Sequence, residues 1–354
     1  MADGDYDFAV LGSTPLAALL AGLLAAQHGR RVALVSDAPS PFQLQRGLDL
    51  SASVLTRPET LILLRSVTAE TSKLLNELGK GLVDRIDPLF IAETPASAAA
   101  LLHFRHLGRA LGLTIDLQAD RDLPNATMMK IRGVMRIAQT RLLPALEGWY
   151  ERHDVRRLSR ADTVVTVRRD GSARLAAGSF VVDAKTVILA DDVAIIDHLT
   201  EETRDRSLVL VPTAATLLEP RKPLPAPVTA FLDRGVVVQQ EGRFGVSAVV
   251  SGDQSTVHAR LGASIARGGP VRRAGETVFT SVTTSDGAPL VTTAKGGKAM
   301  VLAGFGATGA FLAPAIARFV VDKSSTDEAL WFAARGSLRG NQRLDAAEYQ
   351  AATP

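Results

Sequence analysis

Residues 7–17, DFAVLGSTPLA, decide the fold of this chain. A mostly apolar run, DFAVL, ends in a glycine-containing turn, and the apolar segment AALLAGLLAAQ (17–27) follows. After Gly29 comes a second apolar run, VALVS (32–36). Strand, tight turn, helix, turn and strand in this order predict the opening of a dinucleotide-binding βαβ unit.

This turn holds only one of the three glycines of the dinucleotide-binding fingerprint. Gly12 makes the tight turn, Thr14 stands where a glycine lets backbone approach a pyrophosphate, and Ala17 is a tolerated substitute for the third glycine. The hydroxyls of Ser13 and Thr14 are able to cap the helix or hydrogen-bond a phosphate. Two interpretations stay open: a pyrophosphate site assisted by hydroxyls, or a capped structural helix whose nucleotide site has decayed.

The end of the second strand predicts a ribose contact. An acid at this point normally binds the ribose hydroxyls. By spacing, Ser36 takes that position, and a shift of one residue brings Asp37 into use. The alternative for Asp37 is a solvated acid in a loop.

Composition limits the class of protein. The 354 residues suit two domains, and 46% hydrophobic with 22% charged residues is an ordinary globular balance. The absence of cysteine excludes disulfides, thiolate catalysis and zinc–thiolate sites. Basic residues are scattered at a net charge of +3, so we expect no nucleic-acid partner. The apolar run has no basic region before it and is too short to span a bilayer, so we expect a cytoplasmic protein without a membrane span.

The rest of the chain changes from mixed α/β to β-rich character. Residues 207–283 are rich in β-branched residues and turns, which favours a mostly antiparallel sheet. The other expected elements are helices at 58–78, from Pro95 to Gly112, at 133–152 and from Gly309 to Val321, strands at 88–92, 113–116, 184–190 and 299–303, and a hairpin at 162–175. The tail from about Gly336 is polar.

The order of these segments resembles the D-amino-acid oxidase/glycine oxidase superfamily of FAD-dependent oxidoreductases. The resemblance covers nearly all of residues 6–325. The most specific segment is TTSDGAPLVTTAKGGKAMVLAGFGATGAFLAPAIARFV (283–320), where a D-G-x-P turn precedes a strand, a glycine-rich turn and a helix. IRGVMRIAQTRLLPALEGWYERHDV (131–155) resembles the helix that returns to the flavin domain, and residues 161–192 resemble the hairpin and strand that cradle the adenosine.

The resemblance implies a fold class and a division into domains. The fold is α/β, with a Rossmann-like FAD-binding domain and an inserted, mostly antiparallel β-sheet substrate domain. The implied FAD-binding domain comprises residues 1–86, 136–202 and 284–335. The implied substrate domain comprises residues 87–135 and 203–283, and residues 336–354 form a polar tail.

The resemblance also implies non-covalent FAD and a set of cofactor contacts. Gly12, Ser13, Thr14 and Ala17 face the pyrophosphate, and Ser36 and Asp37 lie near the ribose. Val164 belongs to the adenosine hairpin. The helix after the closing glycine-rich turn points its N-terminus at the flavin ring, where free N–H groups stabilise negative charge. That turn contains Gly304, Phe305, Gly306, Ala307, Thr308 and Gly309.

Two groups of residues depart from the family pattern, one at the end of a strand and one at the expected substrate arginines. Asp191 and Asp192 stand where the family has a small residue and a glycine, and carboxylates near a diphosphate repel it unless they point to solvent. Family members often carry an arginine for the substrate carboxylate where this chain has Ser281, and another where it has Gln239 or Gln240. Arg243, Arg272 and Arg273 are alternatives, with surface arginines as the default interpretation.

No catalytic residue and no metal site can be assigned. His103 and His106 lie three residues apart on a predicted helix, without further ligands. The first hypothesis is an FAD-dependent oxidoreductase acting on a small amine, amino acid or related substrate, with oxygen or a partner as electron acceptor. The alternative is a non-catalytic flavoprotein-fold subunit or assembly partner. An NAD(P)-dependent dehydrogenase is a third possibility that leaves the closing glycine turn unexplained.

Overall fold

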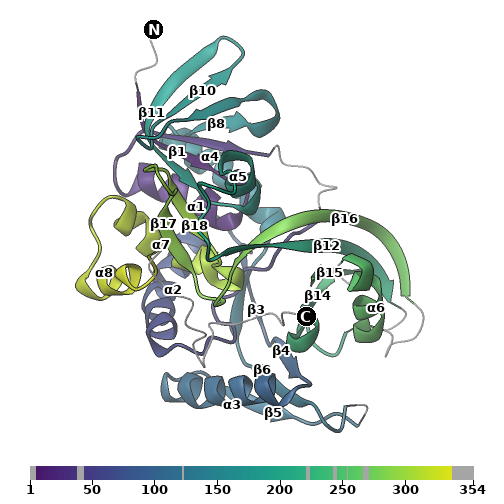
Figure 1. Ribbon diagram of the computed structural model, residues 1–354. Coiled ribbons are helices and arrows are strands. Elements are labelled where there is room, and N and C mark those ends of the chain that lie inside the picture. Colours follow the sequence, from purple (N-terminus) through teal and green to yellow (C-terminus); the bar gives the residue numbers. More distant parts are fainter. Residues whose placement is uncertain are drawn as a thin grey trace.

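The computed structural model describes residues 5–37, 44–121, 123–220, 224–241, 245–252, 254–265 and 271–336 (Figure 1). Two large sheets organise this part of the chain. One is mainly parallel and the other mainly antiparallel, as the sequence predicts. The α/β fold class is therefore confirmed.

The parallel sheet is built around the first βαβ unit. Its order is β17-β18-β11-β1-β2-β8, and β9 and β10 extend from β11 as an antiparallel pair. Its strands are β1 (Tyr6–Leu11), β2 (Val32–Ser36), β8 (Arg156–Ser159), β9 (Val164–Val167), β10 (Ala173–Ala177), β11 (Phe180–Leu189), β17 (Leu290–Thr293) and β18 (Met300–Ala303). The carboxyl ends of β1, β2, β11 and β18 meet at one edge, where an α/β sheet normally binds its ligand.

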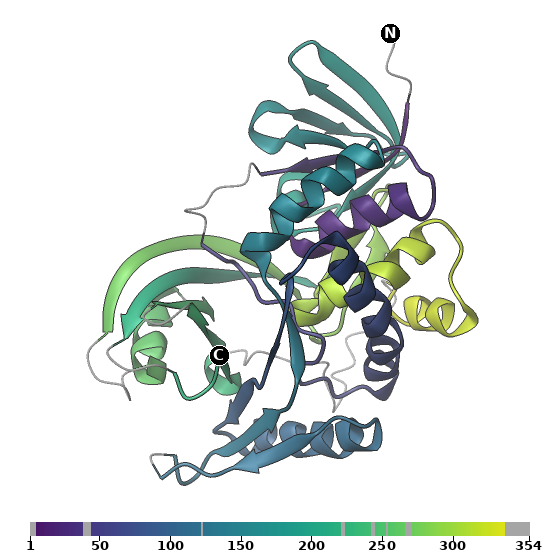
Figure 2. The ribbon, with the colours of Figure 1, turned by 180° about the vertical axis from the view of Figure 1, so that it is seen from behind.

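Helices cover one face of this sheet (Figure 2). Helix α1 (Pro15–Ala26) packs against α4 (Gln139–Arg152) and α7 (Gly309–Val320), and its residues from Leu16 to Ala25 are buried. Burial on all sides explains why this segment is apolar all round. The other face packs on the short helix α5 (Asp192–His198) and on side chains of β10.

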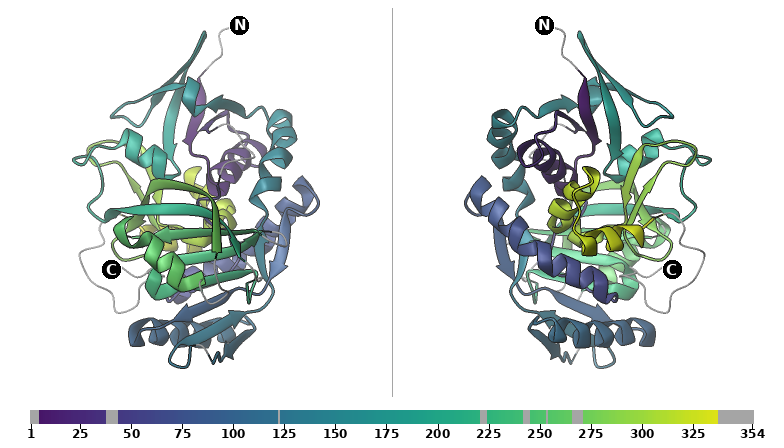
Figure 3. Two further views of the ribbon diagram at one scale, coloured as in Figure 1. Left: turned by 90° about the vertical axis from the view of Figure 1, so that its right-hand side faces the viewer. Right: turned by 90° about the vertical axis from the view of Figure 1, so that its left-hand side faces the viewer.

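The antiparallel sheet lies beside this layer (Figure 3). Its order is β16-β12-β15-β14-β13-β4-β6-β5, and only β4 and β13 pair in parallel. Its strands are β4 (Leu89–Ala92), β5 (Ile115–Gln118), β6 (Thr127–Ile131), β12 (Leu208–Pro220), β13 (Val228–Phe231), β14 (Val236–Glu241), β15 (Gly245–Ser251) and β16 (Val271–Thr284). The proposed division into domains follows these two sheets and stays a prediction.

The remaining helices surround the two sheets. They are α2 (Pro58–Leu78), α3 (Pro95–Ala110), α6 (Gln254–Ile265) and α8 (Thr326–Ala333), with 3-10 turns at Arg160–Asp162, Leu232–Arg234 and Gly306–Thr308. A separate two-stranded sheet pairs β3 (Val83–Ile86) with β7 (Val134–Ile137). Among the described residues, no helix is both long and apolar enough to cross a bilayer.

The expected helix at 133–152 is wrong in its first turn. Residues 134–137 form strand β7, and α4 begins only at Gln139. Gly133 has a φ of +66°, which turns the chain between β6 and β7, and pairing with β3 then holds the segment extended. Helix α6 was not expected within 207–283, and β5 begins two residues later than expected.

Candidate functional site

The turn after β1 is tightly packed and hydrogen-bonded to the chain's own residues. A Cβ on Gly12 would lie 2.9 Å from the Cβ of Ala17 and 3.2 Å from the backbone of Ala190, so the turn requires glycine there. Thr14 caps α1: its Oγ1 accepts a hydrogen bond from the N–H of Ala17 at 3.2 Å and donates to the carbonyl of Ala190 at 3.3 Å. The Thr14 hydroxyl is thus committed to the fold.

Asp191 reaches the same turn from the end of β11. Its Oδ2 accepts a hydrogen bond from the N–H of Ser13 at 2.7 Å, and its Oδ1 accepts one from the N–H of Ala194 at 2.7 Å. The side chain is only 7% exposed. Asp191 therefore caps α5 and binds an N–H of the turn that the sequence assigned to a phosphate.

Arg160 neutralises this carboxylate. It follows β8, which β1 and β2 separate from β11 in the sheet, and its Nη2 lies 2.9 Å from Asp191 Oδ2. Its Nε lies 3.7 Å from Asp37 Oδ1. The N–H of Asp37 donates to Ser13 Oγ at 2.8 Å. We call Ser13, Asp37, Arg160 and Asp191 the turn cluster. Sequence reasoning missed Arg160, because nothing local relates it to a residue 31 positions away.

Asp192 also points inward. Burial raises its pKa to about 6, against hydrogen bonds from the Val282 N–H and the Ser281 side chain, which lower it. A diphosphate would have room here only if both carboxylates pointed to solvent. The carboxylates of Asp191 and Asp192 both point inward instead. Ser281, which stands at the position of a family arginine, faces Asp192.

The closing glycine turn is explained largely by packing. Gly304 has a φ of +69°, and a Cβ there would lie 2.9 Å from Thr284. A Cβ on Gly309 would lie 2.9 Å from that of Phe305. A Cβ on Gly306 would meet no atom within 4 Å, so only this glycine of the three borders open space. Thr308 is buried, and its hydroxyl donates to the carbonyl of Phe305 at 3.2 Å.

A third carboxylate lies at the start of α7. Asp49 is buried, accepts a hydrogen bond from Gln139 Nε2 at 2.7 Å, and is also hydrogen-bonded by the N–H of Ala310. Burial is the larger effect and raises the pKa of Asp49 to about 7. The neighbouring Leu50 N–H donates to the carbonyl of Ala307 at 2.6 Å. The helix start that the resemblance directs at a flavin ring is thus contacted by the chain's own residues 49–50.

Of the other candidate residues, Ser36 lies at this edge of the sheet, where it ends β2 and pairs with Ser159 of β8. Val164 is 68% exposed on β9. Gln239 donates to Gln45 Oε1 at 3.2 Å. Arg272 forms an exposed ion pair with Glu219, and Arg273 forms one with Glu276, as expected of surface arginines. Arg243 lies outside the described residues.

Neither histidine of the predicted pair lies in a metal site. His103 Nε2 lies 3.1 Å from the carbonyl oxygen of Thr56. Within the described part of the chain, no group of three or more histidine, aspartate or glutamate side chains is placed to hold a metal ion.

Comparison with solved structures identifies the fold. L-proline dehydrogenase from P. horikoshii matches with a TM-score of 0.71 at 13% identity, covering 93% of this chain and 96% of that one. Glycine oxidase from Geobacillus kaustophilus matches with a TM-score of 0.68 at 16% identity, covering 95% and 99%. Iminodiacetate oxidase from Chelativorans sp. BNC1 matches with a TM-score of 0.66 at 17% identity, covering 90% and 96%.

These matches define the class of structure. The chain has the fold of the D-amino-acid oxidase/glycine oxidase superfamily over almost its whole length. No family model and no curated protein matches the sequence. At this level of identity the likeness shows the fold, and the chemistry has to be argued from the residues of the site.

Proposed function

We propose that this chain is a non-catalytic member of the amino-acid-oxidase fold, which has lost ordinary FAD binding and acts as a subunit or assembly partner of another protein. One observation carries the proposal: the Asp191 carboxylate accepts the hydrogen bond of the Ser13 N–H. In a dinucleotide-binding turn this region of backbone faces the pyrophosphate. Asp191 supplies the negative charge that the turn would otherwise take from a cofactor.

The energies favour the carboxylate over a diphosphate. A helix N-terminus stabilises an anion by about 0.3–2 kcal/mol. Two unit charges 4 Å apart repel by about 4 kcal/mol at an effective dielectric constant of about 20. Arg160 offsets part of that repulsion, and its guanidinium already pairs with Asp191 and lies 3.7 Å from Asp37, while its buried Nη1 has no hydrogen-bond partner among the described residues. FAD bound in the usual position would have to displace Asp191 and leave Arg160 without its nearest acid.

The substrate side supports the same proposal. The resemblance implies an arginine for a substrate carboxylate at position 281, where a serine faces an aspartate. A carboxylate substrate placed there would meet Asp192, whose pKa is raised by burial and lowered in part by the nearby Arg46. Ser281 cannot pair with a substrate carboxylate as an arginine at this position would.

The visible spectrum of the full chain, purified from cells supplied with riboflavin, tests the proposal. We expect a colourless protein that stays colourless after incubation with FAD and removal of the excess. A yellow protein with one flavin per chain would overturn the proposal.

A second candidate function is an FAD-dependent oxidoreductase acting on a small amine or amino acid. The likeness to solved amino-acid and amine oxidases over more than nine-tenths of the chain favours it, together with the open space beside Gly306. FAD would then supply the redox chemistry, and the chain's task would be to place the substrate C–H bond beside it. In that case the purified protein is yellow, and Gly306→Asp should abolish the colour.

A further inference from the structure

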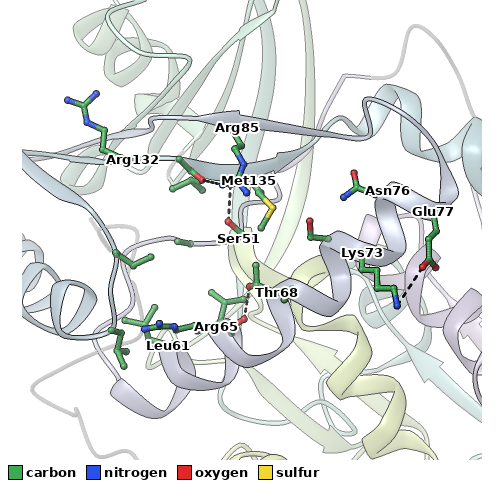
Figure 4. Close-up of a pocket in the computed structure, with 18 residues that line it drawn as sticks. Ser51, Leu61, Arg65, Thr68, Lys73, Asn76, Glu77, Arg85, Arg132 and Met135 are labelled. Carbon is green, nitrogen blue, oxygen red and sulfur yellow. Dashed lines mark hydrogen bonds and ion pairs between the residues drawn. The ribbon is translucent and has the colours of Figure 1, made fainter.

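We propose that a cleft between α2 and the β3–β7 pair binds a small amphipathic anion, an organic carboxylate with an apolar body. The cleft has a volume of about 730 Å³ and is lined by α2, the end of α3 and the turn before β7 (Figure 4). Small-molecule sites typically enclose about 300–1,000 Å³. None of the residues of the turn cluster lines it, so this site is separate from the candidate cofactor site and independent of the proposed function.

The body of the cleft is apolar. Four buried and three partly buried apolar side chains contribute to its lining: Ala52, Leu61, Leu64 and Val134, with Leu111, Leu113 and Met135. Burying a ligand's hydrocarbon against such a surface contributes about 25 cal/mol for each Å² removed from water. The lining therefore favours a ligand with an alkyl or aryl body.

The charged side chains at the cleft are not all neutralised by the protein. Arg132 forms ion pairs with Asp87 and Asp116, and its guanidinium points away from the cleft in Figure 4. Lys73 and Glu77 pair with each other at 3.9 Å. These charges are balanced within the protein.

Arg65 and Arg85 are left as the unbalanced charges. Among the described residues, neither has a carboxylate within 4 Å. Arg65 lies on α2, and Arg85 lies on β3 next to Ser51 and Met135 (Figure 4). The two arginines come from opposite walls of the cleft, and Arg85 Nη1 donates to the carbonyl of Gly133 at 3.3 Å. A cation on each wall beside an apolar floor matches a ligand that carries an anionic group on an apolar body.

A hydroxyl group also lines the cleft, beside Met135, which is the β7 partner of Arg85. Ser51 Oγ accepts a hydrogen bond from the N–H of Met135 at 2.9 Å, and among the described residues its hydroxyl proton has no acceptor. That proton is able to donate to an anion held by Arg85. The arginine would attract the anionic group of the ligand, and the hydroxyl donor would orient it against the apolar surface.

Fluorescence titration of the full chain with 8-anilinonaphthalene-1-sulfonate, followed by displacement with octanoate, tests the proposal. We expect one saturable site, displaced by octanoate and not by 1-octanol. Arg65→Gln and Arg85→Gln should each weaken binding about tenfold, the loss of one hydrogen bond to a charged group. Arg109→Gln, an exposed arginine of α3 outside the cleft, is the matched control and should leave binding unchanged.

Ala69→Phe tests the location of the site. Ala69 is an exposed residue of α2 that lines the cleft, so a larger side chain fills the cleft without disturbing the core. We expect it to abolish the octanoate-sensitive signal while the thermal unfolding midpoint stays unchanged. Binding that survives Ala69→Phe, equal displacement by 1-octanol, or equal affinity of the arginine variants and Arg109→Gln would each overturn the proposal.

Discussion

Replacing Asp191 tests whether its carboxylate is a structural part of the turn. Asp191→Ala removes a cap of α5, the acceptor of the Ser13 N–H and the nearest acid to Arg160. Loss of the cap costs about 1 kcal/mol, and an unpaired N–H costs about 1–3 kcal/mol. Breaking a buried ion pair costs about 3–5 kcal/mol. Because Arg160 is 19% exposed and Asp37 remains near it, we expect a total loss of about 3–5 kcal/mol.

A double-mutant cycle isolates the ion pair from the other losses. The variants are Asp191→Asn, Arg160→Gln and their combination, and the assay is urea unfolding at neutral pH. We expect a coupling energy of about 1–3 kcal/mol between the two residues. Asp191→Asn retains the size of the side chain, so its effect reports charge and not a cavity.

An exposed ion pair provides the matched control for this cycle. Arg168 and Asp183 form an ion pair in which both side chains are more than 40% exposed. Surface pairs contribute about 0–1 kcal/mol, so Asp183→Ala should change stability by less than that. If Asp191→Ala costs no more than Asp183→Ala, the carboxylate is not a structural part of the turn, and the reasoning is refuted.

Two further predictions concern burial. Burial raises the pKa of Asp49 from an ordinary 3.8 to about 7, so the folded chain holds a proton that the unfolded chain has released between pH 4 and 7. Stability should therefore fall as pH rises through this window, by up to about 4 kcal/mol from this group. Asp49→Asn should remove most of this pH-dependent loss of stability and leave the smaller contribution of Asp192. If urea unfolding of Asp49→Asn shows the same pH profile as the parent, the assignment to Asp49 is contradicted. Gly22→Ala should cost about 1–3 kcal/mol by thermal unfolding, because the new Cβ would lie 1.9 Å from the Trp149 ring; a variant as stable as the parent would show that the helices separate without cost.

The elements with strong local patterns could be predicted from the sequence. Helix α2 has the predicted bounds 58–78, because its apolar spacing and the proline at its first position are both local signals. The Asp170–Gly171 turn likewise marks the hairpin of β9 and β10. Strand β7 was missed because Met135 lies seven residues before Leu142, a helical spacing, and the segment was joined to the helix that follows. Pairing with β3 holds the segment extended.

The candidate site could be located but not understood from the sequence. The two glycine turns indicated where to look for it, and Asp191 and Asp192 were recognised as departures from the family pattern. The structure adds Arg160, which pairs with Asp191, and Asp49, which contacts the start of α7. Both approach from segments with no local signature. Side-chain partners more than 30 residues apart have no periodicity that a sequence pattern can reveal.

Calorimetric titration of FAD into the full-length chain tests the central claim most directly. If Asp191 holds the anion position of the first turn, we expect no saturable heat, with a dissociation constant weaker than about 100 μM. Stoichiometric binding of FAD in the micromolar range or tighter would contradict the claim, since the diphosphate would then bind despite that carboxylate.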